Sequence, residues 1–359
     1  MLTLLIKDPQ RAAVEKASDG RQTVLYTAKG QPSHLYVVPR FTVDAHGAIN
    51  APDGQLHPAF IVNDRPLSEV FYGVYQGVLR NNELLSLPGQ LPSRDLDFDR
   101  CHQAARACGQ GWHLSTNAER SALALWCLAQ GWSPQGNTEQ AGVPYGAEVD
   151  PVMVSGAGPD AWRHDLSPHG IADLCGNIWE WQAGLRLLDG EVHVIANNNA
   201  AQADVSRDSP AWQAIRLSDS ALVPCGSAGS AKFDAPNPNR EGNAGIAILA
   251  EQILHYNGEL GSDANTPGLL DCAFNQLRST LPTEPPLLLK LLGLYPHRDL
   301  PDGDQLYLRN YGERLLLRGG AWYSGSNAGL RTLCLSHPRT HASLTVGARP
   351  AFIESTGVL

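Results

Sequence analysis

Short apolar runs separated by turn residues fill the first ninety positions of the chain. The runs are rich in Val, Leu, Tyr and Phe, and they cover residues 23–26, 34–38, 41–43, 59–62 and 69–75. Residues of these types in runs of this length favour β-strands. A short helix is expected in front of them, because Asp8 can cap it and Pro9 suits its first position.

Two helices are expected next. In the first, near residues 97–107, one face carries Cys101, Ala104, Ala105 and Cys108 at i, i+3, i+4 and i+7. That spacing is typical of a helix packed on a sheet. The second helix is marked by Thr116 and Glu119, which can form a capping box, and it is expected to end at Gly131.

The second half of the chain alternates long polar stretches with short apolar ones. Loops are expected over residues 136–168 and 197–243, helices over 245–254 and 286–293, and strands over 305–308, 314–318 and 346–352. With 35 Gly and 25 Pro and only 18% charged residues, many turns and irregular connections are expected. The pattern therefore predicts an α+β fold.

Composition excludes several classes of function. The formal charge is −9 and the basic residues are not clustered, which argues against binding to a phosphate backbone. No apolar stretch is long enough for a membrane helix, so no membrane insertion is expected. The apolar run within residues 1–9 is too short for a signal peptide, so we expect synthesis in the cytoplasm. The seven cysteines form no CxxC pair and are expected to be mostly buried thiols.

Five motifs follow one another in a recognisable order. They are Gly-Trp-His-Leu-Ser-Thr-Asn-Ala-Glu at 111–119, Gly-Asn-Thr at 136–138, a segment ending in Gly-Asn-Ile-Trp-Glu-Trp at 170–181, Leu-Arg-Gly-Gly-Ala-Trp at 317–322, and Val-Gly-Ala-Arg at 346–349. Together they resemble the formylglycine-generating-enzyme-like (sulfatase-modifying factor) branch of the C-type lectin fold. The resemblance implies mixed and antiparallel sheets with two flanking helices and long loops. It also implies an N-terminal segment at 1–58, a lectin-like domain at 59–359, and an insertion at about 197–312.

The C-terminal segment at about 317–352 is similar to the variable region of prophage-type proteins diversified by a retroelement. In that family a frame of fixed residues surrounds positions whose asparagine codons are randomised at adenines. The matching positions here are Tyr323, Ser324, Cys334, Ser336, His337, His341, Ser343, Leu344 and Thr345. All nine residues can arise from AAC codons in this way. An ordinary divergent loop is the alternative interpretation.

The resemblance implies a ligand-binding display protein that is not an enzyme. Its partner would be an unknown protein or surface ligand that contacts the variable region, and its final location a virion or cell surface. The inward-facing frame would be Trp322, Leu330, Leu333, Leu335, Val346 and Phe352, and the best ligand anchors Tyr323, His337, His341 and Leu344. The alternative is a purely structural virion or surface protein that recognises no ligand.

Three kinds of chemistry would contradict this interpretation: oxidation by a cysteine pair, zinc binding by two histidines, and acid–base catalysis. The related oxidases need two cysteines, but Ser324 and Gly329 stand at those places. His337 and His341 have the spacing of a helical zinc pair, yet Pro338 between them argues against a helix. His113 and Glu119 could form an acid–base pair, although capping explains Glu119 more simply.

A structural calcium ion is the one cofactor that the resemblance suggests, and none is required. Its ligands would be the carboxylates of Asp173 and Glu180 and the carbonyls of Gly176 and Ile178. Such hard oxygen donors suit Ca²⁺. Asp173 and Glu180 may equally accept hydrogen bonds from loop N–H groups.

Overall fold

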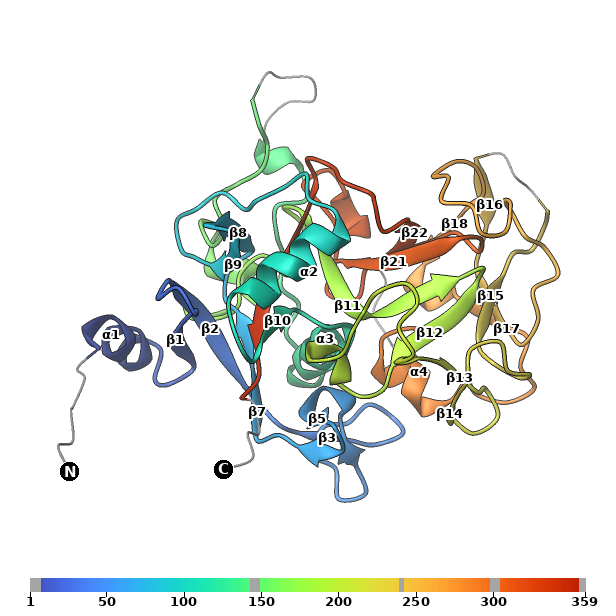
Figure 1. Cartoon of the computed structure of the whole chain (residues 1–359), viewed down its shortest axis with the longest axis horizontal. Coiled ribbons are helices and arrows are strands. Elements are labelled where there is room, and N and C mark those ends of the chain that lie inside the picture. The colour runs from blue at the N-terminus through green and yellow to red at the C-terminus, as the bar shows by residue number, and fades with distance from the viewer. Residues whose placement is uncertain (1–7, 143–148, 239–241, 298–303, 355–359) are drawn as a thin grey trace.

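We describe a computed structural model of the chain that covers residues 8–142, 149–238, 242–297 and 304–354. Residues 1–7, on which the expectation about a signal peptide rests, lie outside this part. The architecture is mixed α+β: a smaller sheet and a larger one lie side by side, with α2 and α3 packed against them (Figure 1). Among the described residues, no helix is both long and apolar enough to span a membrane.

The smaller sheet joins the two ends of the chain. Its order is β1 (Gln22–Tyr26), β2 (Pro32–Pro39), β7 (Glu69–Gly73), β24 (Pro350–Phe352) and β10 (Trp112–Leu114). Every neighbouring pair in it is antiparallel. The sheet therefore crosses the boundary expected at residue 58, because strands from both sides of it are hydrogen-bonded to each other.

The larger sheet has thirteen strands and carries the C-terminal segment near its middle. Its main order is β16 (Asn243–Gly245), β18 (Leu269–Ala273), β20 (Gln305–Leu308), β22 (Leu333–His337), β21 (Glu313–Arg318), β11 (Trp179–Leu188), β12 (Glu191–Ile195), β15 (Lys232–Asp234), β17 (Ile248–Ala250) and β19 (Arg278–Ser279). Off this path lie β13 (Trp212–Ile215), β14 (Leu222–Val223) and β23 (Val346–Ala348). The pairs β20–β22 and β11–β23 are parallel, so the sheet is mixed, as expected.

Short hairpins and single turns complete the fold. The hairpins are β3 (Thr42–Val43) with β4 (Gln55–Leu56), β5 (Ile61–Val62) with β6 (Arg65–Pro66), and β8 (Gly77–Arg80) with β9 (Glu83–Ser86). The 3-10 turns are η1 (Pro58–Phe60), η2 (Gln140–Gly142), η3 (Asp160–Trp162), η4 (Asn199–Ala201), η5 (Phe274–Gln276) and η6 (Gly325–Asn327).

Side-chain caps begin three helices, and the sequence predicts two of them, Asp8 and Thr116. The side chain of Asp8 caps α1 (Pro9–Ala17), and that of Asp97 caps α2 (Phe98–Ala107). The capping box of α3 (Asn117–Gln130) is complete, since Thr116 and Glu119 each accept a backbone N–H from the other. It ends at Gly131, whose φ of 70° lies in the left-handed region that suits glycine.

The remaining predictions for the second half are partly wrong. Residues 245–254 are not a helix, because Ile248 and Leu249 pair with β15 on one side and β19 on the other. Long-range pairing has overridden a short apolar run that fits either structure. Residues 197–243 are not only loop, since they contain β13, β14 and β15. The predicted helix at 286–293 is confirmed as the shorter α4 (Leu287–Leu291).

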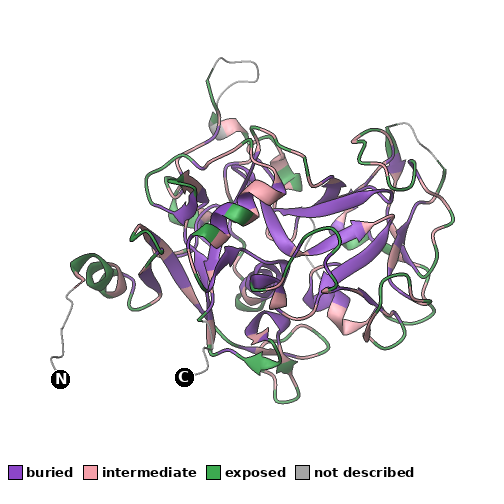
Figure 2. Ribbon diagram, in the orientation of Figure 1, coloured by how far each residue is buried: buried purple, intermediate pink, exposed green. Residues whose placement is uncertain are grey.

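Buried residues follow the centre of both sheets, whereas exposed residues gather on α1, the peripheral loops and the hairpin of β3 and β4 (Figure 2). The core divides at β22. Leu333 and Leu335 belong to the largest apolar cluster, and Cys334 belongs to a second cluster with Trp179 and Trp181. Successive side chains of a strand point to opposite faces, so β22 separates the two clusters.

Candidate ligand-binding surface

The predicted variable positions of β22 lie on one face of the strand. Leu333 and Leu335 are 0% exposed and pack on the core side. Cys334 and Ser336 alternate with them, and the Cys334 sulfur lies 3.0 Å from the Ser336 hydroxyl. This alternation separates frame residues from candidate ligand contacts on a single strand.

An open hollow of about 330 Å³ lies over that second face. Its lining includes five of the predicted positions, namely Tyr323, Ser324, Cys334, Ser336 and His337. The rest of the lining is Trp179, Leu269, Tyr307, Arg309 and Asn327. Residues from four distant parts of the chain thus form one concave surface, the usual shape of a small binding site. We call it the display hollow.

Aromatic rings form part of the wall. Trp179 and Tyr307 meet edge to face with ring centroids 6.1 Å apart, and Asn327 donates a hydrogen bond to the Tyr307 hydroxyl at 3.2 Å. Burial raises the pKa of Tyr307 to about 12, so its hydroxyl stays protonated at neutral pH. Tyr323 is 52% exposed and rests edge to face on Trp322, which leaves its hydroxyl end free to contact a ligand.

A buried arginine adds positive charge to the hollow. Arg309 donates to the carbonyls of Pro267 at 3.1 Å and Ser336 at 2.9 Å. Burial lowers its pKa, yet a guanidinium remains charged at neutral pH. No carboxylate lies within ion-pairing distance of it in the part of the chain that the structure describes.

Sequence reasoning missed the three lining residues that come from the predicted insertion. Leu269 begins β18, Tyr307 lies in β20, and Arg309 follows that strand. The period-2 pattern of β20, with Leu306 and Leu308 in the core, gives a signal that Tyr307 faces the opposite side. The parallel pairing of β20 with β22 is what brings these residues to the hollow.

Two histidines stack at the end of β22. The rings of His337 and His341 are 3.9 Å apart at 14°, and His341 also meets Trp181 edge to face. Burial is the main cause that lowers the pKa of His337 to about 3, and it lowers the pKa of His341 too. Both rings are therefore neutral at pH 7. His337 lies in a strand, as Pro338 suggests, so the pair lacks the geometry of a helical zinc site.

The last three predicted positions lie outside the lining of the display hollow. Leu344 is 65% exposed, and the hydroxyls of Ser343 and Thr345 lie 3.1 Å apart. The backbone is held more firmly than these side chains, because Asp95 donates to the Ser343 carbonyl and Trp179 to that of Thr345. The loop can therefore exchange side chains while its backbone stays fixed.

The frame before η6 depends on two glycines. Gly319 and Gly320 have φ values of 95° and 86°. A Cβ on Gly319 would lie 2.9 Å from the Leu174 carbonyl, and one on Gly320 would lie 2.7 Å from the Cβ of Ala328. Only glycine fits here without strain. Ser324 has a structural role as well, since its hydroxyl accepts the N–H of Ala321 at 2.9 Å.

The frame ends in a buried ion pair at the predicted calcium loop. Arg349, 0% exposed, donates to both Glu180 oxygens at 2.8 and 2.6 Å. Gln76 donates to the same carboxylate and to the Ile178 carbonyl.

Asp173 is similarly supplied with protein donors. It accepts hydrogen bonds from Ser155 and from the backbone of Gly156, each at 2.8 Å, and burial raises its pKa. Gly176 binds Gly319 through its N–H. A cation at this loop would compete with a guanidinium and with the donors of Gln76, Ser155 and Gly156, so the donor set does not fit calcium. Calcium stays a prediction that a fall in melting temperature on chelation would support.

The oxidase positions are occupied as the sequence says, by Ser324 and Gly329. Cys334 is buried, burial raises the pKa of its thiol, and it forms no disulfide. A thiol of this kind is a poor nucleophile and a poor metal ligand at neutral pH. His113 and Glu119 are hydrogen-bonded at 2.8 Å, but Glu119 also accepts from Thr116 and Asn198 inside the core, which is a structural arrangement.

Comparisons with known proteins assign no family to the chain. No protein-family model matches the chain. No curated protein matches it either. Solved structures with a related arrangement carry the names of variable proteins and tropism determinants. Treponema denticola variable protein 1 is 11% identical with a TM-score of 0.35, over 92% of this chain and 98% of that one. The Major Tropism Determinant U1 variant is 12% identical with a TM-score of 0.32, over 89% of this chain and 62% of that one.

Proposed function

We propose that this chain is a ligand-binding display protein whose C-terminal surface is diversified by a retroelement. In this proposal it belongs to the formylglycine-generating-enzyme-like branch of the C-type lectin fold, has no enzymatic activity, and serves a phage tail or another surface. The supporting observation is that five of the nine predicted variable positions line one hollow.

The proposal is also supported by the separation of the frame from the variable positions. Leu333, Leu335 and Val346 are buried in the core, at 0%, 0% and 2% exposure. Tyr323 and Leu344 project into solvent. Substitutions at exposed positions usually change stability by less than about 0.5 kcal/mol, so such side chains can vary while the fold persists.

The hollow offers the kind of anchors that tight recognition uses. Trp179, Tyr307 and Tyr323 present large rings that lose little conformational freedom on binding. Arg309 supplies a charged group on a rigid base. Binding energy in interfaces concentrates in such aromatic and arginine residues. The ligand would be a protein or other surface group that inserts a side chain into the hollow.

Population sequencing tests the diversification. Strains that carry the gene should differ at Tyr323, Ser324, Ser336 and His341 by adenine-derived changes, while Leu333, Leu335 and Arg349 stay constant. A near-identical template repeat and a reverse transcriptase gene should lie nearby. Invariance at the first four positions would refute the proposal in favour of a purely structural surface protein.

A selection experiment tests binding itself. A library randomised at Tyr323, Ser324, Ser336 and His337 should yield binders to unrelated protein targets. The matched control is a library of equal size at exposed apolar positions elsewhere, Leu254 and Leu260, which are 73% and 55% exposed. Equal enrichment from the two libraries would show that the hollow has no special binding capacity.

A further inference from the structure

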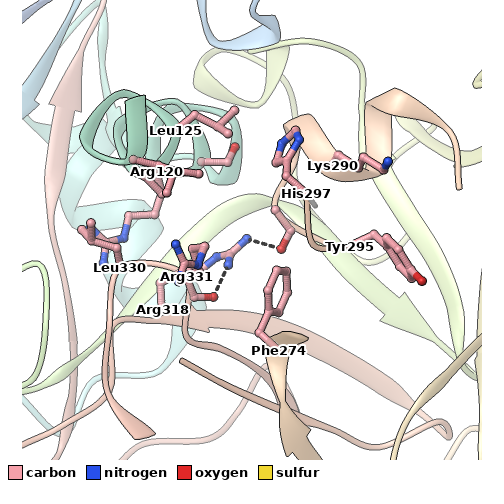
Figure 3. A pocket seen from close by; sticks show the side chains of 13 residues that line it. Arg120, Leu125, Phe274, Lys290, Tyr295, His297, Arg318, Leu330 and Arg331 are labelled. Carbon is pink, nitrogen blue, oxygen red and sulfur yellow. Dashed lines mark hydrogen bonds between the residues drawn. The ribbon is translucent and has the colours of Figure 1, made fainter. Parts of the chain in front are cut away.

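A second, narrower pocket lies between α3, α4 with the segment after it, and the C-terminal segment (Figure 3). Arg120 and Leu125 reach it from α3, Lys290 and His297 from α4 and the segment after it, and Arg318 and Leu330 from the C-terminal segment. The centres of water-sized atoms have about 20 Å³ of room in it. One or two atoms fill a space of that size.

Arg318 brings an unneutralised charge to this pocket. Its side chain is 2% exposed and donates to Asn117 Oδ1 at 2.7 Å and to the carbonyls of Arg331 at 2.9 Å and Leu292 at 3.1 Å. All these acceptors are neutral. Burial, and after it the charge of nearby Arg120, lowers the pKa of Arg318 to about 9.

Arg120 adds a second buried guanidinium. It is 2% exposed, and its Nη2 donates to the carbonyl of Leu174. Its Nη1 has no hydrogen-bond acceptor among the residues that the structure describes. A buried N–H of a charged group without an acceptor is costly, on the order of 1–3 kcal/mol or more. The position therefore calls for an acceptor that the described residues do not provide.

The carboxylates near the pocket already have partners. Asp304 is 2.7 Å from the guanidinium of Arg331, and Glu284 is 3.0 Å from the Lys290 ammonium. Within the described part of the chain, no carboxylate is within 4 Å of a nitrogen of Arg120 or Arg318. Two buried cations thus line one pocket without a carboxylate partner among the described residues, although buried charges are normally paired.

His297 completes the polar part of the wall. It is 8% exposed, and its ring lies close to the Lys290 backbone without a hydrogen bond of regular geometry among the described residues. Burial lowers its pKa to about 4, so the ring is neutral at pH 7 and carries one N–H donor. Apolar side chains, among them Phe274 and Tyr295, make up most of the remaining wall and keep water away.

We propose that this pocket binds one compact monovalent anion, a halide or the carboxylate of a very small acid, between Arg120 and Arg318. The anion accepts the free N–H of Arg120 and offsets the repulsion between the two guanidiniums. Arg318 also donates to the Arg331 carbonyl, and Leu330 lines the pocket. The bound anion therefore stabilises the segment at 330–331, which leads into β22. This site is independent of what the display hollow binds.

Bromide tests the proposal directly, because its anomalous scattering identifies it in a crystal. Crystals of the full chain grown or soaked in sodium bromide should show an anomalous peak between Arg120 and Arg318. Crystals in sodium formate should instead show planar density there if the site prefers a carboxylate. A pocket without density, in crystals that show bromide elsewhere on the surface, would overturn the proposal.

Solution measurements give a second test. At constant ionic strength, replacing a bulky organic sulfonate by bromide or formate should raise Tm along a saturating curve, as expected for a ligand that binds only the folded state. Arg120→Met should remove this dependence. The matched control is Arg314→Met, since Arg314 is another fully buried arginine held by carbonyls, outside the pocket, and its variant should keep the full anion response.

Each result has a defined meaning. An anion response retained in Arg120→Met would contradict the site. If Arg120→Met does not fold, the crystallographic test on the unaltered protein still decides. Loss of binding by the display hollow with an intact bromide site would reject the proposed function alone.

Discussion

The predicted variable positions fall into two physically different regions. Cys334 and Ser336 lie inside the fold, 4% and 3% exposed, on a strand hydrogen-bonded on both sides. Leu344 lies on a loop and is 65% exposed. One sequence pattern therefore covers positions where side-chain volume is limited and positions where it is free.

The difference indicates how such a surface could tolerate change. Exposed loop positions can accept many side chains, whereas the side chain at Cys334 must fit between Tyr307 and Leu317, its neighbours on β20 and β21. Strand positions should then tune the shape of the hollow, and loop positions should extend its rim. The following predictions test this contrast, beginning with the frame that both regions share.

The largest effect is expected for the frame residue between the two strand positions. Leu335→Ala removes a side chain that is 0% exposed in the main core, and it should lower the free energy of unfolding by about 2–5 kcal/mol. Urea denaturation measures this loss. A loss below 1 kcal/mol would mean that β22 does not anchor the segment in the core.

The next largest effect concerns volume on the other face of the same strand. Cys334→Phe should cost about 1–3 kcal/mol, because the ring has to displace Tyr307 or Leu317. Tyr323→Phe, on the exposed rim, is the comparison. If Cys334→Phe were as stable as the unaltered protein, strand and loop positions would be equally permissive, and the contrast would fail.

The third prediction is that acid lowers the free energy of unfolding through His337, at the end of β22. Because the pKa of His337 is lowered to about 3 by burial and by nearby His341, Arg309 and Arg314, the ring is neutral in the folded chain where it is charged in the unfolded chain. The unfolded state binds more protons between pH 6.5 and 3. The free energy of unfolding therefore decreases as pH falls below 6.5. The loss is about 1.4 kcal/mol per pH unit.

Comparison with His337→Gln isolates that contribution, since other buried histidines are present in both proteins. Unfolding free energies measured from pH 7 to pH 5 should fall less steeply for His337→Gln. Parallel pH curves would show that His337 is as solvated as the loop residues.

The smallest effect is expected on the loop. Leu344→Ser should change the free energy of unfolding by less than about 0.5 kcal/mol, since the side chain is mostly in water already. It should nevertheless lower the affinity of any ligand that was selected for binding to the unaltered surface. A stability loss comparable to that of Leu335→Ala would place Leu344 in the frame instead.

Local signals in the sequence predicted the local structure well. The capping residues Asp8 and Thr116 mark two helix starts correctly, because capping depends on a few adjacent residues. The helix expected at 245–254 was wrong, because its apolar run is completed by strands more than ten residues away in the chain.

The candidate site shows the same limit more strongly. Tyr323, Ser324 and Ser336 were identified from their frame, but Tyr307 and Arg309 reach the hollow through a parallel pairing that no local pattern predicts. The pocket lined by Arg120 and Arg318 is even harder to predict from the sequence. Its cations at positions 120, 290, 318 and 331 show no cluster in the sequence and meet only in the folded chain.

The place of β22 between β20 and β21 has a consequence for the proposed diversification. A strand at the border of a sheet offers unpaired N–H and C=O groups to other molecules, and some random sequences there would polymerise. Here both borders of the strand are covered, one of them by a segment that lies outside the changing region. Side chains on β22 can thus change under the proposed diversification without exposing unpaired backbone groups on which other chains could polymerise.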